Sequence, residues 1–379
     1  PYLLQLPGSR VSHIMGSYRY EILRETTTDS LIMENNTREK KMNSNVYGID
    51  LGTCNMKIYC KTSNKILNEK NTIALVKKDQ IYAYGDAAYA MYEKAPETIN
   101  VTFPVISGVI ADFNNLQTML QMYLEEHMKG KIRGAEFIVA VPTDITDVEK
   151  RAFFEMFYKS KLKPKSVLLC EKPIADAVGL GLDVNEPTGI MVVDIGADTT
   201  EISVISLGGL VLSDLLHFGG NRIDESIITY VKRTYNLVIG QKTAQALKEK
   251  LGSGIPGNTE TMVIVGRDVV SGLPIEMEIT GEVVYEAIKD NLNSICNSIK
   301  MILEKTPPEL AKDIIHSGIY ITGGSSQIHN LSQLFKDITG IEINTCEEPE
   351  ECVVRGLVKI VSDQKYKHLA FSMKNKILK

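Results

Sequence analysis

The sequence contains no tryptophan, and aromatic residues make up only 7% of its 379 residues. It has no surplus of basic residues either, because 42 Lys and Arg stand against 47 Asp and Glu, for a net charge of -5. This balance excludes a general electrostatic attraction to nucleic acid or to an anionic membrane, so any bound anion must be held by local geometry. No apolar run approaches the roughly 20 residues of a membrane-spanning helix, and no signal peptide with a clean apolar core opens the chain.

Cysteine is sparse, with six residues and no Cys-x-x-Cys pair. This spacing favours reduced thiols over a disulfide framework or a zinc site. The six histidines also lack an HExxH or similar ligand spacing. We therefore expect a cytoplasmic protein without a zinc centre.

The first 44 residues are polar and lack sustained periodicity. We interpret them as a disordered leader or a remnant of cloning, with Met42 as the candidate native start. The remaining chain is long enough for two globular domains.

From Val46 onward, strands and helices alternate, which predicts an α/β architecture with two similar cores. Apolar residues at helical spacing predict helices over residues 116–128 and 284–302, the second stopped by Pro307-Pro308. A capping box from Thr146 to Glu149 predicts a helix that runs to about Leu162, and Glu149 is explained by this structural role. Further helices are expected over 175–180, 224–235 and 241–251, and strands over 46–51, 56–60, 137–141, 167–170, 190–195, 201–206, 210–213, 263–265, 275–279 and 319–322.

Two segments that begin 144 residues apart share one pattern, Ile49–Ile58 and Val193–Ile202. Each has an apolar strand, an Asp at its end, a Gly-centred turn with small hydroxyl residues, and a returning strand. Such a turn can present backbone N–H groups to a phosphate, because Gly allows the main chain to approach closely. Two facing carboxylates, Asp50 and Asp194, can hold a hydrated Mg²⁺. One such turn alone is usually a simple hairpin, but two in matching contexts favour a polyphosphate site.

Several motifs resemble the MreB family of bacterial actin-like proteins, which set rod shape. The matching segments are Ile49–Thr53, Gly108–Phe113, Ile145–Ala152, Val192–Gly196, Thr306–Leu310 and Ile321–Gly324. The resemblance covers about Val46 to Val361. It implies an actin-like, duplicated ribonuclease-H-like fold, with ATP and Mg²⁺ between two lobes and head-to-tail assembly into paired protofilaments.

The resemblance also implies a domain division. Residues 45–188 would form the first lobe, with a small subdomain at about 72–106, and residues 345–379 would complete it. Residues 189–344 would form the second lobe, with a small subdomain at about 223–283.

Site residues follow from the same resemblance. Asp50 and Asp194 would face the Mg²⁺. The phosphate turns would supply Gly52, Thr53, Cys54, Asn55, Gly196, Ala197, Asp198 and Thr199. The nucleoside would contact Gln245, Ala246, Leu247 and Lys248, and the base would lie against Gly323, Gly324, Ser325, Ser326 and Gln327.

Four positions in this set depart from the family. Ala197-Asp198 stands where the family has two glycines, and a carboxylate there should repel a phosphate. Lys172 replaces the glutamate that orients the attacking water. The other two departures are Cys54 for Ala and Gln245 for Glu.

The loss of the carboxylate at Lys172 should remove general-base help worth about 10²–10⁴ in rate. The ammonium should at the same time attract the terminal phosphate by about 4 kcal/mol at about 4 Å and an effective dielectric of about 20. We expect Lys172 and Asp198 to pair across the cleft, with Glu171, Lys172 and Thr199 as the catalytic candidates. The alternative is that Lys172 points to solvent and Glu171 positions the water. Lys57, Arg151 and Arg355 are expected to be solvated or helix-end cations.

The sequence therefore predicts an ATP-binding, filament-forming subunit of the bacterial cytoskeleton that acts in cell shape with weak hydrolysis at most. The alternatives are a nucleotide-binding scaffold without turnover and a sugar or acetate kinase of the same fold. A chaperone-type ATPase is disfavoured because only 18 residues follow Val361. The expected partners are a second copy of the chain and the cell-wall elongation machinery, with no nucleic acid. The 128–133 loop has one aliphatic residue among three cations, and with the lysines over 365–379 it would give at most peripheral contact with the inner membrane.

Overall fold

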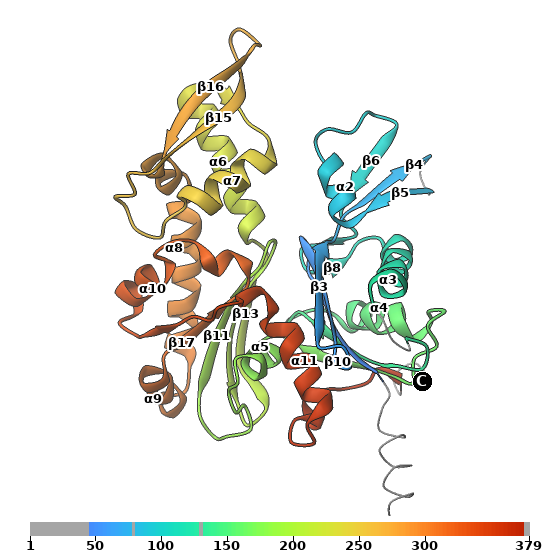
Figure 1. The fold of residues 1–379 in the computed structure, drawn as a ribbon. Coiled ribbons are helices and arrows are strands. Elements are labelled where there is room, and N and C mark those ends of the chain that lie inside the picture. The colour runs from blue at the N-terminus through green and yellow to red at the C-terminus, as the bar shows by residue number, and fades with distance from the viewer. Residues whose placement is uncertain (1–44, 78–79, 129–131, 375–379) are drawn as a thin grey trace, which may run out of the picture. The chain divides into compact units, whose positions relative to one another are not determined.

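The computed structural model describes residues 45–77, 80–128 and 132–374. The expected leader over residues 1–44 lies outside these ranges. In the described part of the chain, two five-stranded sheets form the centres of two lobes, and three smaller sheets accompany them (Figure 1).

The first large sheet has the strand order β10-β9-β1-β2-β3. Its strands are β1 (Val46–Leu51), β2 (Asn55–Cys60), β3 (Lys65–Lys70), β9 (Glu136–Val141) and β10 (Ser166–Glu171). Strands β1 to β3 form an antiparallel meander, whereas β9 runs parallel to both β1 and β10. Every residue of β1 is buried, as expected of a central strand that is covered on both faces.

The second large sheet has the order β13-β12-β11-β17-β18. Its strands are β11 (Ile190–Ile195), β12 (Thr200–Ser206), β13 (Gly209–Leu216), β17 (Ile319–Thr322) and β18 (Ile343–Asn344). Its topology repeats that of the first sheet: β11 to β13 form an antiparallel meander, and β17 runs parallel to β11 and β18. The repeat seen in the sequence is therefore a repeat of sheet topology.

Helices cover the first sheet on both faces. On one face, α3 (Phe113–His127) and α4 (Asp147–Tyr158) bury an apolar core that includes Leu116 and Phe153. On the other, α5 (Lys172–Gly179) and α11 (Cys352–Ser362) share a core with residues from both large sheets, such as Ile138 and Val192 (Figure 1). We call the first sheet with α3 and α4 the first lobe.

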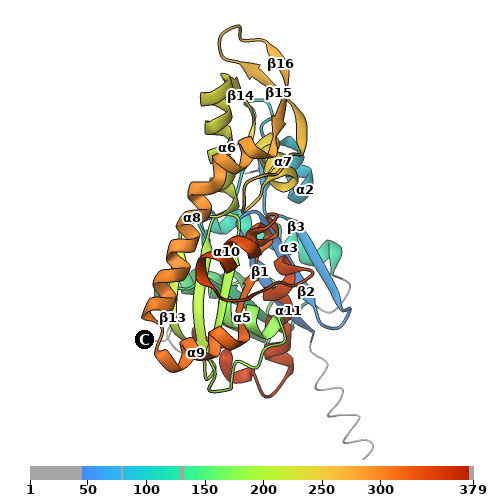
Figure 2. The same ribbon diagram turned by 90° about the vertical axis from the view of Figure 1, so that its left-hand side faces the viewer.

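Helices of the second lobe share one continuous apolar core with the second sheet. They are α6 (Gly220–Tyr235), α7 (Gln241–Leu251), α8 (Gly281–Lys305), α9 (Pro308–Ser317) and α10 (Leu331–Thr339). The apolar residues of α8 recur every three or four positions from Val284 to Ile302 and are buried, which explains why this helix follows the second lobe along its length (Figure 2).

The two three-stranded sheets fall inside the ranges predicted for the small subdomains. The first joins β5 (Gln80–Tyr84), β4 (Ile73–Val76) and β6 (Ile99–Thr102), next to helix α2 (Gly85–Met91). The second joins β14 (Leu237–Val238), β15 (Thr261–Asp268) and β16 (Pro274–Thr280). A short ribbon of β7 (Val105–Ile106) and β8 (Val109–Ile110) completes the set, with 3₁₀ turns η1 (Gly324–Gln327), η2 (Pro349–Glu351) and η3 (Lys367–Leu369).

The capping box at the start of α4 is confirmed. The Thr146 hydroxyl accepts the Glu149 N–H at 3.2 Å, and the Glu149 carboxylate accepts the Thr146 N–H at 2.7 Å. The predicted end of this helix near Leu162 is wrong, because α4 ends at Tyr158. The Ser160 hydroxyl donates to the carbonyl oxygen of Phe157 at 2.6 Å, which satisfies a helix-end acceptor and allows the chain to turn.

Candidate functional site

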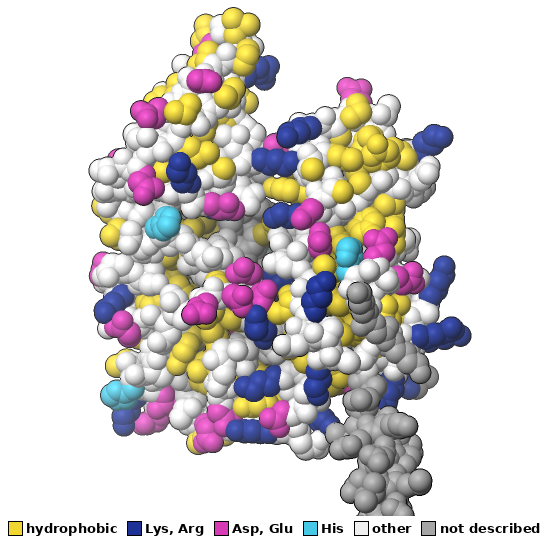
Figure 3. Space-filling model, viewed as in Figure 1, with side chains coloured by type: hydrophobic (Ala, Val, Ile, Leu, Met, Phe, Trp, Pro, Cys, Tyr) yellow, Lys and Arg dark blue, Asp and Glu magenta, His cyan; other side chains and the backbone are white. Residues whose placement is uncertain are grey.

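A cavity of about 890 Å³ is lined by residues of both lobes, and Figure 3 shows the molecule hollowed there, with acidic and basic side chains around it. Its size lies in the range of small-molecule sites. The predicted site residues that line it are Asp50, Gly52, Thr53, Cys54, Asn55, Lys172, Asp194, Gly196, Ala197, Asp198, Thr199, Gln245, Lys248, Gly323, Gly324, Ser325 and Gln327. The structure therefore brings together residues from across most of the described chain.

Four predicted site residues do not line this cavity. Leu247 is fully buried in the core of the second lobe, and Ala246 precedes it on α7. The Ser326 hydroxyl donates to the carbonyl oxygen of Gly323 at 2.7 Å and so holds the turn after β17. The Glu171 carboxylate faces Lys150 at 3.7 Å. The alternative in which Glu171 replaces Lys172 in the cavity therefore has no support from this geometry.

The two repeated turns both line the cavity and depend on glycine. A Cβ added at Gly52 would lie 2.7 Å from the Asn55 carbonyl oxygen, and one added at Gly196 would lie 3.1 Å from that of Thr199. The Gly196 N–H donates to the Thr199 carbonyl at 2.9 Å, which closes the second turn. The main chain of both turns is thus tightly folded at the cavity wall, as the sequence repeat predicted.

Each aspartate at a strand end has a different partner across its hairpin. Asp50 on β1 lies opposite Lys57 on β2, whereas Asp194 on β11 lies opposite Glu201 on β12. The two lobes repeat the backbone, but the charge of the facing residue is reversed between them.

Asp50 lies between two lysines. Its Oδ2 is 3.5 Å from the ammonium nitrogen of Lys57, and its Oδ1 is 3.3 Å from that of Lys172. Burial would raise the pKa of Asp50, but the two ammonium groups hold it below its ordinary value. Burial would lower the pKa of Lys172, but Asp50 and the carboxylates beyond it raise it. Lys57 was expected to be solvated; its side chain is only 12% exposed and it is an ion-pair partner instead.

Three buried carboxylates lie near Lys172: Asp194 on β11, Glu201 on β12 and Asp176 on α5. Asp194, Asp176 and Glu201 are all buried, and burial raises the pKa of each, that of Glu201 to about 8. Both carboxylate oxygens of Asp176 and Oε1 of Glu201 are without a hydrogen-bond partner. Position 323, next to Asp194, requires glycine. An added Cβ there would lie 2.2 Å from Asp194 Oδ1, and Gly323 has a φ of +84°.

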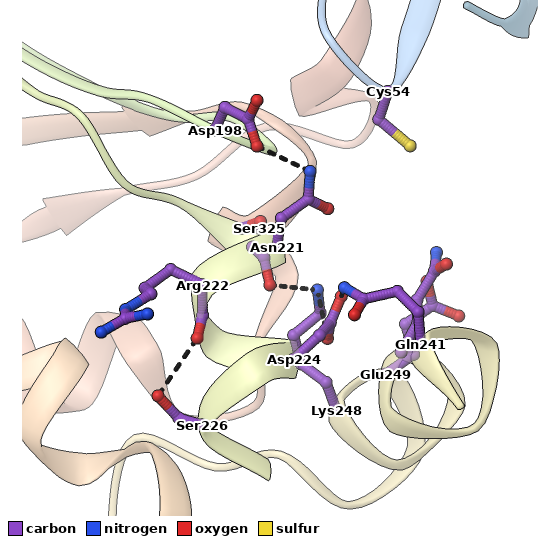
Figure 4. A network of polar contacts seen from close by, with 12 residues as sticks. Cys54, Asp198, Asn221, Arg222, Asp224, Ser226, Gln241, Lys248, Glu249 and Ser325 are labelled. Carbon is purple, nitrogen blue, oxygen red and sulfur yellow. Dashed lines mark hydrogen bonds and ion pairs between the residues drawn. The ribbon is translucent and has the colours of Figure 1, made fainter. Parts of the chain in front are cut away.

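The predicted ion pair between Lys172 and Asp198 is wrong. Lys172 pairs with Asp50 instead. Asp198 accepts two hydrogen bonds of its own, one from Asn221 Nδ2 at 2.7 Å (Figure 4) and one from the Ser107 N–H at 2.9 Å. The physical reason is that Asp50 is the more deeply buried carboxylate and offers Lys172 a nearer counter-charge.

Helix α7 and the start of α6 form the far wall of the cavity. Lys248 reaches Asp224 at 2.9 Å and donates to the Gly220 carbonyl at 3.0 Å (Figure 4). Burial raises the pKa of Asp224 to about 6, although Lys248 acts in the opposite direction. Gln245 accepts a hydrogen bond from the Tyr89 hydroxyl of α2 at 2.8 Å, which links this wall to the small sheet of the first lobe.

Sequence reasoning missed several lining residues. They are Lys57, Lys70, Tyr89, Gly220, Asn221 and Asp224. Only Lys57 carried a readable signal, since the β1–β2 hairpin register places it opposite Asp50. Lys70 donates to Asn55 Oδ1 at 3.1 Å and so brings a further cation to the first turn.

Asp50, one of the two aspartates predicted for Mg²⁺, does not suit a metal in this geometry. Both Asp50 oxygens face ammonium groups. Mg²⁺ needs oxygen ligands at about 2.0–2.1 Å, including waters that require room of their own. In the described ranges there is also no group of three or more His, Cys, Asp and Glu side chains that could hold a metal ion.

Comparisons with known proteins identify the family. The MreB/Mbl protein family matches residues 44–368. The chain is 38% identical over 312 residues to the cell shape-determining protein Mbl of Bacillus subtilis, covering 82% of this chain and 93% of that protein. It is 39% identical over 324 residues to the cell shape-determining protein MreB of Escherichia coli K12, covering 83% and 92%. The chain belongs to the MreB/Mbl family.

Solved structures agree with this family assignment. MreB 5 of Spiroplasma citri bound to AMPPNP matches with a TM-score of 0.81 and 32% identity, over 86% of this chain and 98% of that one. The MamK double helical filament matches with a TM-score of 0.73 at 22% identity, over 85% and 99%, which bears on the fold alone. The actin-like fold expected from the sequence is confirmed for this MreB/Mbl family member. No helix in the described ranges is long and apolar enough to cross a membrane.

Proposed function

We propose that this MreB/Mbl family member binds ATP between its two lobes and assembles head to tail into cytoskeletal filaments that organise cell-wall synthesis. One observation carries the proposal: the Gly-centred turns of both lobes, Gly52–Asn55 and Gly196–Thr199, line one cavity of about 890 Å³. Two such turns can offer backbone N–H groups to the same polyphosphate tail from opposite sides.

The relatives support this assignment. Structures of MreB 5 of Spiroplasma citri contain AMPPNP and ADP, and MamK forms a double helical filament. In this chain, Thr53, Cys54 and Asn55 on one lobe and Ala197, Asp198 and Thr199 on the other would surround the phosphates. Gln245 and Lys248 would contact the nucleoside, and Gly324, Ser325 and Gln327 would lie against the base.

We infer that hydrolysis is weak or absent. Lys172 lines the cavity where the family glutamate would orient water, and its ammonium cannot accept a proton from that water. Glu171 faces Lys150 outside the cavity, so it does not supply the missing carboxylate. Of the three catalytic candidates, Thr199 remains, because it lines the cavity and its neutral hydroxyl can hydrogen-bond a water.

The remaining predictions concern location and partners. We propose a cytoplasmic filament that works with the cell-wall elongation machinery and with another copy of itself. The loop over residues 128–133 was predicted to touch the inner membrane. Its Met128 is buried in the apolar core of the first lobe, and residues 129–131 lie outside the described ranges. This leaves electrostatic attraction as the support for peripheral membrane contact.

A sedimentation assay with phosphate release tests the proposal. The full chain is compared with ATP, with AMPPNP and without nucleotide. We expect equal polymer with both nucleotides, less without, and little phosphate. Gly324→Val should abolish the nucleotide response, because Gly324 lines the cavity and an added Cβ meets no atom within 4 Å, so the new side chain fills the site without disturbing the fold.

Gly209→Val is the matched control. An added Cβ there has only the Ser206 carbonyl oxygen nearby, at 3.9 Å, and Gly209 is not part of the cavity wall. Polymer that ignores nucleotide in the unmodified chain would contradict the proposal. Rapid phosphate release would contradict the inference about Lys172 while leaving nucleotide-dependent assembly intact.

A further inference from the structure

The Lys172 ammonium group lies beside Asp50, one of the two strand-end aspartates that were expected to face a metal ion. Lys172 is the first residue of α5, and its side chain is only 13% exposed. Its nitrogen lies 3.3 Å from Asp50 Oδ1, and that oxygen has no hydrogen-bond partner, so the contact is a charge pair rather than an aligned hydrogen bond. Asp50, Asp194 and Lys172 all line the cavity.

Lys57 engages the second carboxylate oxygen of Asp50, which is then not available as a metal ligand. Its ammonium nitrogen lies 3.5 Å from Asp50 Oδ2, and the hairpin register fixes Lys57 directly opposite Asp50. Two lysines, Lys57 and Lys172, therefore stand at this wall together with the aspartates Asp50 and Asp194. A polyphosphate that entered here would meet cations of the chain itself.

Facing carboxylates repel a polyphosphate unless a cation stands between them, and the usual cation is a divalent metal. In this chain the cation beside Asp50 is a side chain of the protein, the Lys172 ammonium group. It is also compact and carries three N–H donors, which can serve a carboxylate on one side and phosphate oxygens on the other.

We propose that the Lys172 ammonium group replaces a protein-held magnesium ion, so that the cleft accepts nucleoside di- and triphosphates without a divalent cation. This inference rests on the proposed nucleotide binding and specifies the form of the ligand. Lys172 contacts a phosphate oxygen directly, and Asp50 keeps its ammonium group in position.

Binding of a fluorescent ADP analogue to the full chain tests the proposal. Low protein concentration keeps assembly out of the signal, and ADP removes turnover. The dissociation constant is measured with excess MgCl₂ and with excess EDTA. For the unmodified chain we expect less than about a threefold difference between the two conditions.

Variants change the expected result in opposite ways. Lys172→Glu places a third carboxylate beside Asp50 and Asp194, so its affinity should fall at least about tenfold in EDTA relative to MgCl₂. Lys172→Met removes the charge and should weaken binding in EDTA more than in MgCl₂. Lys150→Met is the matched control, because Lys150 pairs with Glu171 and does not line the cavity, and it should behave like the unmodified chain.

Two outcomes separate this proposal from the function on which it rests. A loss of about tenfold or more on chelation in the unmodified chain overturns the inference and leaves nucleotide binding intact. No binding in either condition contradicts the proposed function itself. Mn²⁺ titration followed by electron paramagnetic resonance gives a second readout: the unmodified chain with ADP should retain no more Mn²⁺ than free ADP does, whereas tighter retention would contradict the proposal.

Discussion

Lys172 at the start of helix α5 and Asp50 at the end of strand β1 form an ion pair with 3.3 Å between nitrogen and oxygen. The pair joins the helix between the two sheets to the strand that leads into the first Gly-centred turn, Gly52–Asn55. It replaces the pair with Asp198 that the sequence predicted, and the two arrangements make opposite predictions for double mutants.

A double-mutant cycle in the free energy of unfolding distinguishes them. Lys172→Met and Asp50→Asn should be coupled by about 1 kcal/mol or more, because both groups are buried and each compensates the other. Lys172→Met and Asp198→Asn should be additive within about 0.5 kcal/mol. Urea unfolding of the four proteins in each cycle gives the coupling energies. A larger coupling energy between Lys172 and Asp198 than between Lys172 and Asp50 would support the ion pair predicted from the sequence.

Helices α5 and α11 cross at glycine. A Cβ at Gly356 would lie 1.8 Å from the Ala175 carbonyl oxygen, and one at Gly179 would lie 2.0 Å from that of Cys352. Gly356→Ala should therefore lower the free energy of unfolding by about 1–3 kcal/mol or more, since backbone cannot move aside as a side chain can. Gly209→Ala, with space around its Cβ, should change it by less than about 0.5 kcal/mol in the same urea titration. Equal stability of the two variants would show that the helices can separate at little cost.

Asp224 predicts a specific pH dependence. The folded protein holds a proton on this carboxyl up to about pH 6, whereas the unfolded chain loses it near pH 4. The contribution of Asp224 to the free energy of unfolding should therefore fall as the pH rises through this window, by at most about 1.4 kcal/mol per pH unit, and level off above it.

Asp224→Asn should remove this contribution, so the difference in urea midpoint between variant and unmodified chain should change between about pH 4 and pH 6 and be constant above. Glu286→Gln is the control, because Glu286 lies on another helix, α8, and pairs with Lys289. A constant difference for Asp224→Asn over the whole range would mean that Asp224 is ionised throughout.

The sequence predicted the parts of the site that depend on local chemistry. Strand-end aspartates, glycine turns and the capping box depend on a few consecutive residues. Asp50 and Asp194 lie near the ends of their strands, and Thr146 caps its helix, as the sequence predicted. The pairing of Lys172 could not be predicted, because its partner lies on a strand far away in the chain and burial decides between candidate carboxylates. The partners of Asp198 are likewise distant in sequence, at Ser107 and Asn221.

Mutation of the capping box at the start of α4 tests whether Glu149 has a structural or a functional role. Thr146→Ala should lower the free energy of unfolding by about 1 kcal/mol through the lost cap. Nucleotide affinity should not change, because neither Thr146 nor Glu149 lines the cavity. Thr118→Ala, at an exposed position inside α3, is the control and should have a smaller effect on stability. An affinity change for Thr146→Ala would indicate that this stretch communicates with the site.

Hydrogen exchange of the two turns tests the central claim most directly. If one polyphosphate is held by both lobes, saturating ADP should slow amide exchange in Gly52–Asn55 and in Gly196–Thr199 together. Protection of neither turn, or of one turn alone, would contradict a shared phosphate site in the cavity between them.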